Sequence, residues 1–171
     1  MTRAALLFFV IAAFAQGPPP RFDAFPVLSD WNGPAAAPKL VTRSQRMFRT
    51  RLLNAASEPP NLAGHYRFEV WGCGSECMSG AILDLATGTV IPPPFAKGSR
   101  GWDGVIVCAS AFEGSGIEVR VDSRLVIVRC GLNYDVQLDR NVPDVYYFVL
   151  EGHGFRELAH FHGKAARLLS Q

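Results

Sequence analysis

The stretch NLAGHYRFEVWGCGSECMSG, residues 61–80, decides the fold. Within it Tyr66, Phe68 and Val70 alternate with polar, charged or bulky neighbours, which is the two-residue period of a strand with one buried face. Glycines and two cysteines follow directly, and they favour a sharp backbone path rather than a helix. The stretch therefore predicts a strand that leads into a tight, cysteine-bracketed loop.

Similar short apolar runs follow along the chain. They predict strands over residues 81–85, 105–110, 117–121, 125–130, 145–151 and 155–160, with turn residues at 87–88, 122–123 and 152–154. This spacing leaves no room for crossover helices, so about six or seven short strands should form a mostly antiparallel sheet. With the helix described next, the fold class is α+β.

One amphipathic helix is predicted over residues 38–56, and we expect it to pack on one face of the sheet. Its apolar positions are Leu40, Val41, Met47, Phe48, Leu52 and Leu53, and Pro38 suits a first turn. Its polar face has no acidic residue and carries Lys39, Arg43, Arg46, Arg49 and Arg51. This basic face could meet phosphate, anionic lipid or an acidic protein, although we favour a solvated face.

The N-terminal residues predict export. Arg3 precedes an apolar run over residues 4–15 that is too short to span a bilayer and ends in Ala13-Phe14-Ala15, a fit to the A-x-A cleavage pattern. We expect a signal peptide over 1–15, cleavage near Ala15, an extended Pro-rich lead-in over 16–37 and a single domain over 38–171. The product would be soluble and periplasmic or secreted, with no membrane span.

Bulk charge does not indicate a nucleic-acid partner. The chain has 17 basic and 15 acidic side chains, a formal net charge of +2, and loss of Arg3 would leave 16 and 15. No cofactor is expected, and neither the partner nor the oligomeric state follows from the composition.

Four cysteines in an exported chain favour disulfides, and three pairings are possible. We prefer Cys73–Cys77, which closes a small ring, together with Cys108–Cys130, which would join two predicted strands. The competing interpretation is a zinc site made by Cys73 and Cys77 with His65 or the C-terminal histidines. An oxidising compartment and the absence of a second close ligand pair disfavour it, so no metal site is expected.

Two groups of histidines are candidates for chemistry. His65, Arg67 and Glu69 alternate along one predicted strand, where a histidine beside a carboxylate could act as a general base on an anionic substrate. Ordinary salt-bridged residues on an open strand face are the favoured alternative. His160 and His162 would share a strand face and His153 lies nearby, but no acidic neighbour in sequence completes a metal site.

Two resemblances follow from these motifs. The residues Asn61-x-Ala63-Gly64-His65-Tyr66 and Trp71-Gly72-Cys73-Gly74-x-x-Cys77, with turns at 84–88 and 122–125, resemble a family of small exported bacterial proteins of no established activity. The order of helix, strand and cysteine-bracketed loop is also distantly similar to periplasmic inhibitors of vertebrate-type lysozyme. That family carries Lys-Pro-His-Asp in its loop, whereas this chain has Gly74-Ser75-Glu76.

The sequence thus favours a non-enzymatic, inhibitor-like binding domain that presents residues 71–78 to a protein or glycan partner. The predicted contacts are Trp71, Ser75, Glu76 and Met78, held by the Cys73–Cys77 bond. The alternative is a small exported hydrolase or lyase that uses His65 and Glu69, with Arg67 on the substrate. A third interpretation makes these motifs a packed corner of the sheet with no direct site, and burial of both Trp71 and Glu76 would favour it.

Overall fold

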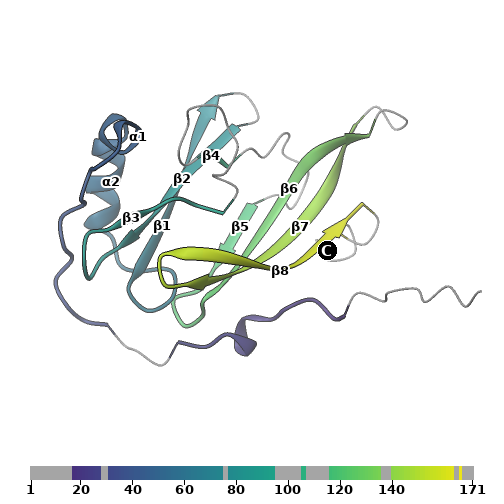
Figure 1. The fold of residues 1–171 in the computed structure, drawn as a ribbon, viewed down its shortest axis with the longest axis horizontal. Helices are drawn as coiled ribbons and strands as arrows, with labels where there is room; N and C mark the ends of the chain where they lie inside the picture. Colours follow the sequence, from purple (N-terminus) through teal and green to yellow (C-terminus); the bar gives the residue numbers. More distant parts are fainter. Residues whose placement is uncertain are drawn as a thin grey trace, which may run out of the picture.

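The computed structural model describes residues 17–27, 31–74, 77–94, 105–106, 116–135, 140–163 and 166. Figure 1 shows the arrangement of the elements. The helical elements are η1 (Phe22–Ala24), α1 (Arg43–Met47) and α2 (Arg49–Ala56). The strands are β1 (Tyr66–Gly74), β2 (Cys77–Asp84), β3 (Val90–Ile91), β4 (Val105–Ile106), β5 (Gly116–Val119), β6 (Leu125–Asp135), β7 (Arg140–Glu151) and β8 (Gly154–His162).

The described strands form two antiparallel sheets. The first has the order β1-β2-β3, with β4 also paired to β2, and the second has the order β5-β6-β7-β8. The predicted α+β class with mostly antiparallel strands is therefore confirmed. Strands β6 and β7 run longer than predicted, and the two-residue strand β3 has too little sequence pattern to be found.

The main core lies between the two sheets. β6 supplies Val126 and Val128 to it, and β1 and β2 supply Phe68 and Ile82, all of them buried. The neighbouring β6 residues, Leu125 and Ile127, are also buried but belong to a second cluster on the opposite face. Since successive side chains of a strand point to opposite faces, the second sheet is covered on both sides.

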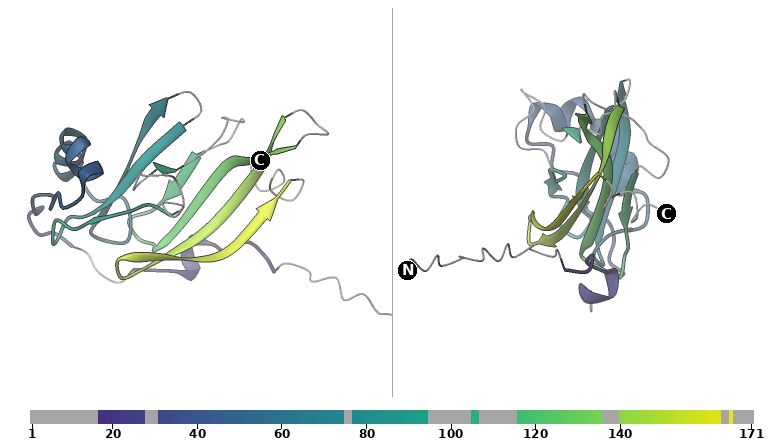
Figure 2. Two further views of the ribbon diagram at one scale, coloured as in Figure 1. Left: turned by 45° about the horizontal axis from the view of Figure 1, so that its top comes forward. Right: turned by 90° about the vertical axis from the view of Figure 1, so that its right-hand side faces the viewer.

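The Pro-rich lead-in covers that opposite face. Phe22 and Phe25 pack against the cluster that contains Leu125 and Ile127. The buried Ser123 hydroxyl fixes the segment, because its Oγ lies 2.8 Å from the Phe22 carbonyl oxygen and 3.1 Å from that of Phe25. Figures 1 and 2 show the purple lead-in passing beside β6–β8 before the chain reaches the helices.

Two short helices replace the single predicted helix. The backbone stays extended through Lys39, whose N–H donates to the Gly88 carbonyl at 2.8 Å, and α1 begins after a capping box formed by Thr42 and Gln45. A break at Phe48 separates α1 from α2. No helix in the described part of the chain has the length and apolar character needed to cross a membrane.

The Asn-x-Ala-Gly-His-Tyr motif makes a corner between the sheets. The Asn61 side chain acts as a substitute strand partner: its Nδ2 donates to the Phe68 carbonyl at 3.0 Å and its Oδ1 accepts from the Phe68 N–H at 2.7 Å. Ala63, with φ 46°, turns the chain so that the Gly64 N–H donates to the Val121 carbonyl at 2.7 Å. The motif thus has a structural role in the β5–β6 corner.

We predict that Gly88→Ala destabilises the protein far more than Gly152→Ala. Both glycines have positive φ, 76° and 59°, but a Cβ at Gly88 would overlap the backbone carbonyl oxygen of Ala37, whereas a Cβ at Gly152 meets open space. The strained φ alone should cost about 1 kcal/mol at Gly152, and the overlap should raise the cost at Gly88 to about 3 kcal/mol or more. Urea unfolding measures both, and equal losses would contradict this contact between the lead-in and the 84–88 turn.

Candidate functional site

The β7–β8 hairpin places acidic, aromatic and histidine side chains on one sheet face. In its register Asp144 is the partner of His162, and Tyr146 is the partner of His160. Residues two apart on antiparallel strands share a face, so all four lie together. This face is the one that carries Phe148, a member of the core between the sheets.

A one-residue bulge in β8 determines this arrangement. From the turn outward, Glu151 pairs with Gly154 and Phe148 pairs with Glu157, but the next pair joins Tyr147 to Ala159. Leu158 is therefore the extra residue. Without it, the register from the turn would place His160 opposite Val145 and leave both histidines on the other face from Asp144.

Asp144 is the centre of the cluster. Its side chain is fully buried, and its Oδ1 lies 2.7 Å from Nε2 of His160 and 2.7 Å from Nδ1 of His162. The histidine side chains are 33% and 55% exposed, so the cluster is open to solvent on the imidazole side. A carboxylate that accepts from both rings requires a proton on each of those two nitrogens.

Ring stacking fixes one of the histidines. The His160 ring lies 4.0 Å from the Tyr146 ring at an interplanar angle of 7°, and Tyr146 in turn stacks on Phe148 at 6.1 Å. Burial raises the pKa of Tyr146 to about 12, with smaller contributions from the negative charges of Asp144 and Glu157. Tyr146 is therefore a neutral phenol that holds the imidazole in place.

These three polar residues could hold a metal ion. Among the described residues, Asp144, His160 and His162 form the one group of three potential ligands, with all ligand atoms within 4.8 Å of one another. Metal–ligand bonds of about 2.0–2.1 Å at tetrahedral or octahedral angles put ligand atoms about 2.9–3.4 Å apart. A few tenths of an ångström of outward movement would open these hydrogen-bonded contacts to that spacing.

Sequence reasoning found the histidine pair but missed the carboxylate. Asp144 lies 16 residues before His160, so nothing local in the sequence connects them. The available signal was the mirrored pattern Asp-x-Tyr and His-x-His on either side of the Gly152-His153-Gly154 turn. Reading it correctly required the bulge, because an ideal hairpin register pairs the wrong residues.

A second carboxylate lies between two other histidines. His65 Nε2 lies 3.6 Å from Oδ1 of Asp84, and His153 Nε2 lies 4.0 Å from Oδ2, both beyond hydrogen-bond range. The buried Asp84 side chain already accepts from the N–H groups of Ala86 and Thr87 and from the Thr87 hydroxyl. It therefore stabilises the 84–88 turn, and this group is the weaker candidate for chemistry.

The predicted set of His65, Arg67 and Glu69 does not come together as one site. Arg67 donates to Oε2 of Glu69 from Nε at 3.3 Å and from Nη2 at 3.2 Å, and its Nη1 donates to the Pro59 carbonyl. His65 precedes β1 and faces Asp84 instead. Arg67 and Glu69 thus form an ordinary ion pair on one face of β1, with His65 outside it.

The predicted display loop is described only at its edges. Trp71 is buried at 6% exposure and packs against Phe48, with ring centroids 4.9 Å apart, and against Leu52 of α2. Met78 is half-buried beside the core between the sheets. Burial of Trp71 excludes it from a contact surface, while Ser75 and Glu76 lie outside the described residues.

The cysteine pairings also lie outside what the structure describes. The backbone of Cys73 belongs to β1, that of Cys77 to β2 and that of Cys130 to β6, but their side chains are not described, nor is any part of Cys108. The described part of β4, next to Cys108 in sequence, pairs with β2. Both disulfides remain predictions.

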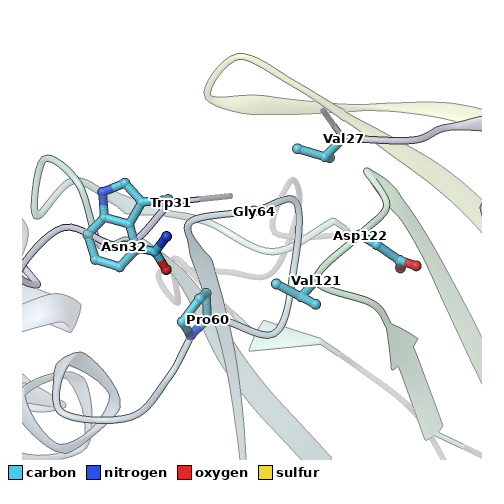
Figure 3. A pocket seen from close by; sticks show the side chains of 7 residues that line it. All are labelled: Val27, Trp31, Asn32, Pro60, Gly64, Val121 and Asp122. Carbon is cyan, nitrogen blue, oxygen red and sulfur yellow. The ribbon is translucent and has the colours of Figure 1, made fainter. Parts of the chain in front are cut away.

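A cleft of about 420 Å³ lies between the lead-in and the corner at Gly64 (Figure 3). Trp31, Pro60 and Val121 contribute apolar walls, and Asp122 is the one ionisable residue among the described residues that line it. The carboxylate of Asp122 is held by Arg120, with a separation of 2.7 Å, and this hydrogen bond lowers the pKa of Asp122. The cleft could therefore accommodate a small ligand, but its described lining has no side chain placed for catalysis.

Comparisons with protein-family models, curated proteins and solved structures find no significant match to this chain. The family resemblances suggested by its motifs stay hypotheses, and the functional argument depends on the geometry of the β7–β8 cluster.

We predict that Tyr146 ionises after Tyr66 and Tyr147, the other tyrosines whose side chains the structure describes. Its pKa of about 12 lies above the ordinary value of 10.0, so folding favours the neutral phenol. The contribution of Tyr146 to the free energy of unfolding is fully present below pH 10. It is lost as the pH rises through about 12, because the phenol ionises at a lower pH in the unfolded chain than in the folded one. Absorbance titration of the wild type and Tyr146→Phe, with circular dichroism to follow folding, measures this.

The Glu157→Gln variant serves as a milder probe, because it removes one negative charge near Tyr146 and should lower the pKa of its phenol slightly. Superimposable absorbance curves for the wild type and Tyr146→Phe between pH 11 and 12.5 would contradict the assignment.

Proposed function

We propose that this protein binds a divalent transition-metal ion, with zinc as the first candidate, through Asp144, His160 and His162. The observation that carries the proposal is the convergence of two imidazole nitrogens on one oxygen of a fully buried carboxylate. Imidazole and carboxylate together suit zinc, copper, nickel and iron rather than calcium or magnesium.

The charge of the cluster supports a cationic ligand. Burying a carboxylate is costly, and a divalent cation beside Asp144 would offset part of that cost. A divalent ion would displace the protons from Nε2 of His160 and Nδ1 of His162 and take both imidazoles and the carboxylate as ligands. The Tyr146 stack would keep the His160 ring in the required orientation.

Three protein ligands leave at least one coordination position for water or a small molecule. Sites of this kind bind and activate a ligand, whereas structural zinc sites use four protein ligands. The partial exposure of His160 and His162 would let a ligand approach from solvent. We therefore regard the cluster as a binding site with a reactive position.

Recognition of a protein or glycan by the β1–β2 hairpin is a separate proposal. Its support is that the two strands carry the backbone of Cys73 and Cys77 to the end of the hairpin, where Gly74 and Cys77 are register partners. With Trp71 buried, the proposed contacts reduce to Ser75, Glu76 and Met78. The hydrolase or lyase alternative lacks comparable support, since Glu69 pairs with Arg67.

The metal proposal predicts saturable zinc binding at a stoichiometry of one. Calorimetric titration of chelator-treated, non-reduced protein should give this result, and zinc at a hundredfold excess over its Kd should stabilise folding by about 2.7 kcal/mol. His160→Ala and His162→Ala should each weaken binding by about 100-fold, as should Asp144→Asn. Acidification should weaken binding as well, because protons compete for the imidazole nitrogens.

The double variant His65→Ala/His153→Ala is the matched control, since it removes two histidines beside the other buried carboxylate. It should bind zinc as the wild type does. Loss of binding in this control with retention in the His160 and His162 variants would refute the assignment. Absence of binding by the folded wild type would mean that the cluster is a hydrogen-bonded network alone.

A further inference from the structure

Residues 39–54 expose both cationic side chains and large apolar side chains. The cationic chains of Lys39, Arg43, Arg46, Arg49 and Arg51 are exposed. The same segment exposes Val41, Met47 and Leu53 at 73%, 58% and 40%, which are three of the four large apolar residues exposed in the described part of the chain. We call these eight residues the basic helical face.

The cations of this face have no carboxylate partners among the described residues. Ion pairs hold other exposed arginines, such as Arg21, Arg120 and Arg156. By contrast, Arg46 donates only to backbone carbonyls at its helix start, and Arg51 lies 5.8 Å from the Trp71 ring centroid. Neither contact neutralises the charge.

The charge is also segregated along the chain. Residues 39–57 contain five cationic and no acidic side chains, whereas the whole chain has a net charge of +2, so the rest carries −3. Figure 1 places α1 and α2 at one end of the molecule, whereas the C-terminal end of β8, which contains His160 and His162, lies toward the other end. The basic helical face is thus distinct from the proposed metal site in both position and charge.

We propose that the basic helical face docks the protein peripherally on an anionic phospholipid bilayer. The interfacial region of a bilayer takes up both components, because lipid phosphates attract the guanidinium groups while Val41, Met47 and Leu53 enter the boundary between headgroups and acyl chains. An acidic protein or a nucleic acid would pair with the cations. It would not account for the exposed aliphatic side chains, which need an apolar environment to be buried. The exposure of Val41 and Met47, at 73% and 58%, therefore favours a bilayer over these other partners.

The test is co-sedimentation of the full chain with vesicles at low salt. Vesicles of phosphatidylcholine with one-third phosphatidylglycerol should bind the wild type, and pure phosphatidylcholine should bind it about tenfold less well. Arg43→Glu/Arg49→Glu should lower binding to the anionic vesicles about tenfold, and added salt should weaken the wild type similarly. Met47→Ser/Leu53→Ser should also weaken binding but should keep its salt dependence.

The control is Arg21→Glu/Arg156→Glu, which makes the same charge change at two exposed arginines away from the helices. It should retain vesicle binding within about twofold. Equal loss in control and test variants, or equal binding to neutral and anionic vesicles, would overturn the proposal. Binding to polyglutamate without binding to anionic vesicles would overturn it too and assign the face to an acidic protein. Zinc binding is measured on the same variants and should be unchanged, which separates this proposal from the metal site.

Discussion

Burial of both faces of β6 is the constraint on which the rest of the structure depends. Four successive residues, Leu125 to Val128, are nearly inaccessible, although a strand of an antiparallel sheet commonly keeps one face in water. Two different layers must therefore cover the second sheet. One layer is the first sheet, and the other is the lead-in, which the Ser123 hydroxyl and the Phe22 and Phe25 rings hold in place.

This two-sided cover explains why the turns contain so many specific contacts. The lead-in has little regular structure of its own, so it is fixed by single hydrogen bonds to the carbonyls of Asp122 and Leu85, and Lys39, just after it, donates to that of Gly88. Asn61 and Gly64 serve the same purpose at the corner between the sheets. Several motifs that look functional in the sequence, including the Asp84 turn, have this structural role.

The polar cluster on β7 and β8 stands out against that background. Its central carboxylate is fully buried on the face that otherwise carries the core, and its partners include two imidazoles. Turn-stabilising carboxylates such as Asp84 have a sufficient structural explanation. Asp144, His160 and His162 offer a carboxylate and two imidazoles, which are potential metal ligands. The stack of Tyr146 on His160 holds one of these imidazoles in place.

The sequence by itself determined the fold class, because the two-residue period of Tyr66, Phe68 and Val70 and the short spacing between turns allow only antiparallel strands. It also located His160 and His162 on one face. It could not predict the late start of α1 at Arg43, since the extended backbone at Lys39 is held by the Gly88 carbonyl, which is distant in sequence. Only the tertiary structure decided that Asp144 meets the two histidines: the bulge at Leu158 moves the register by one residue, and such a shift exchanges the two faces of a strand.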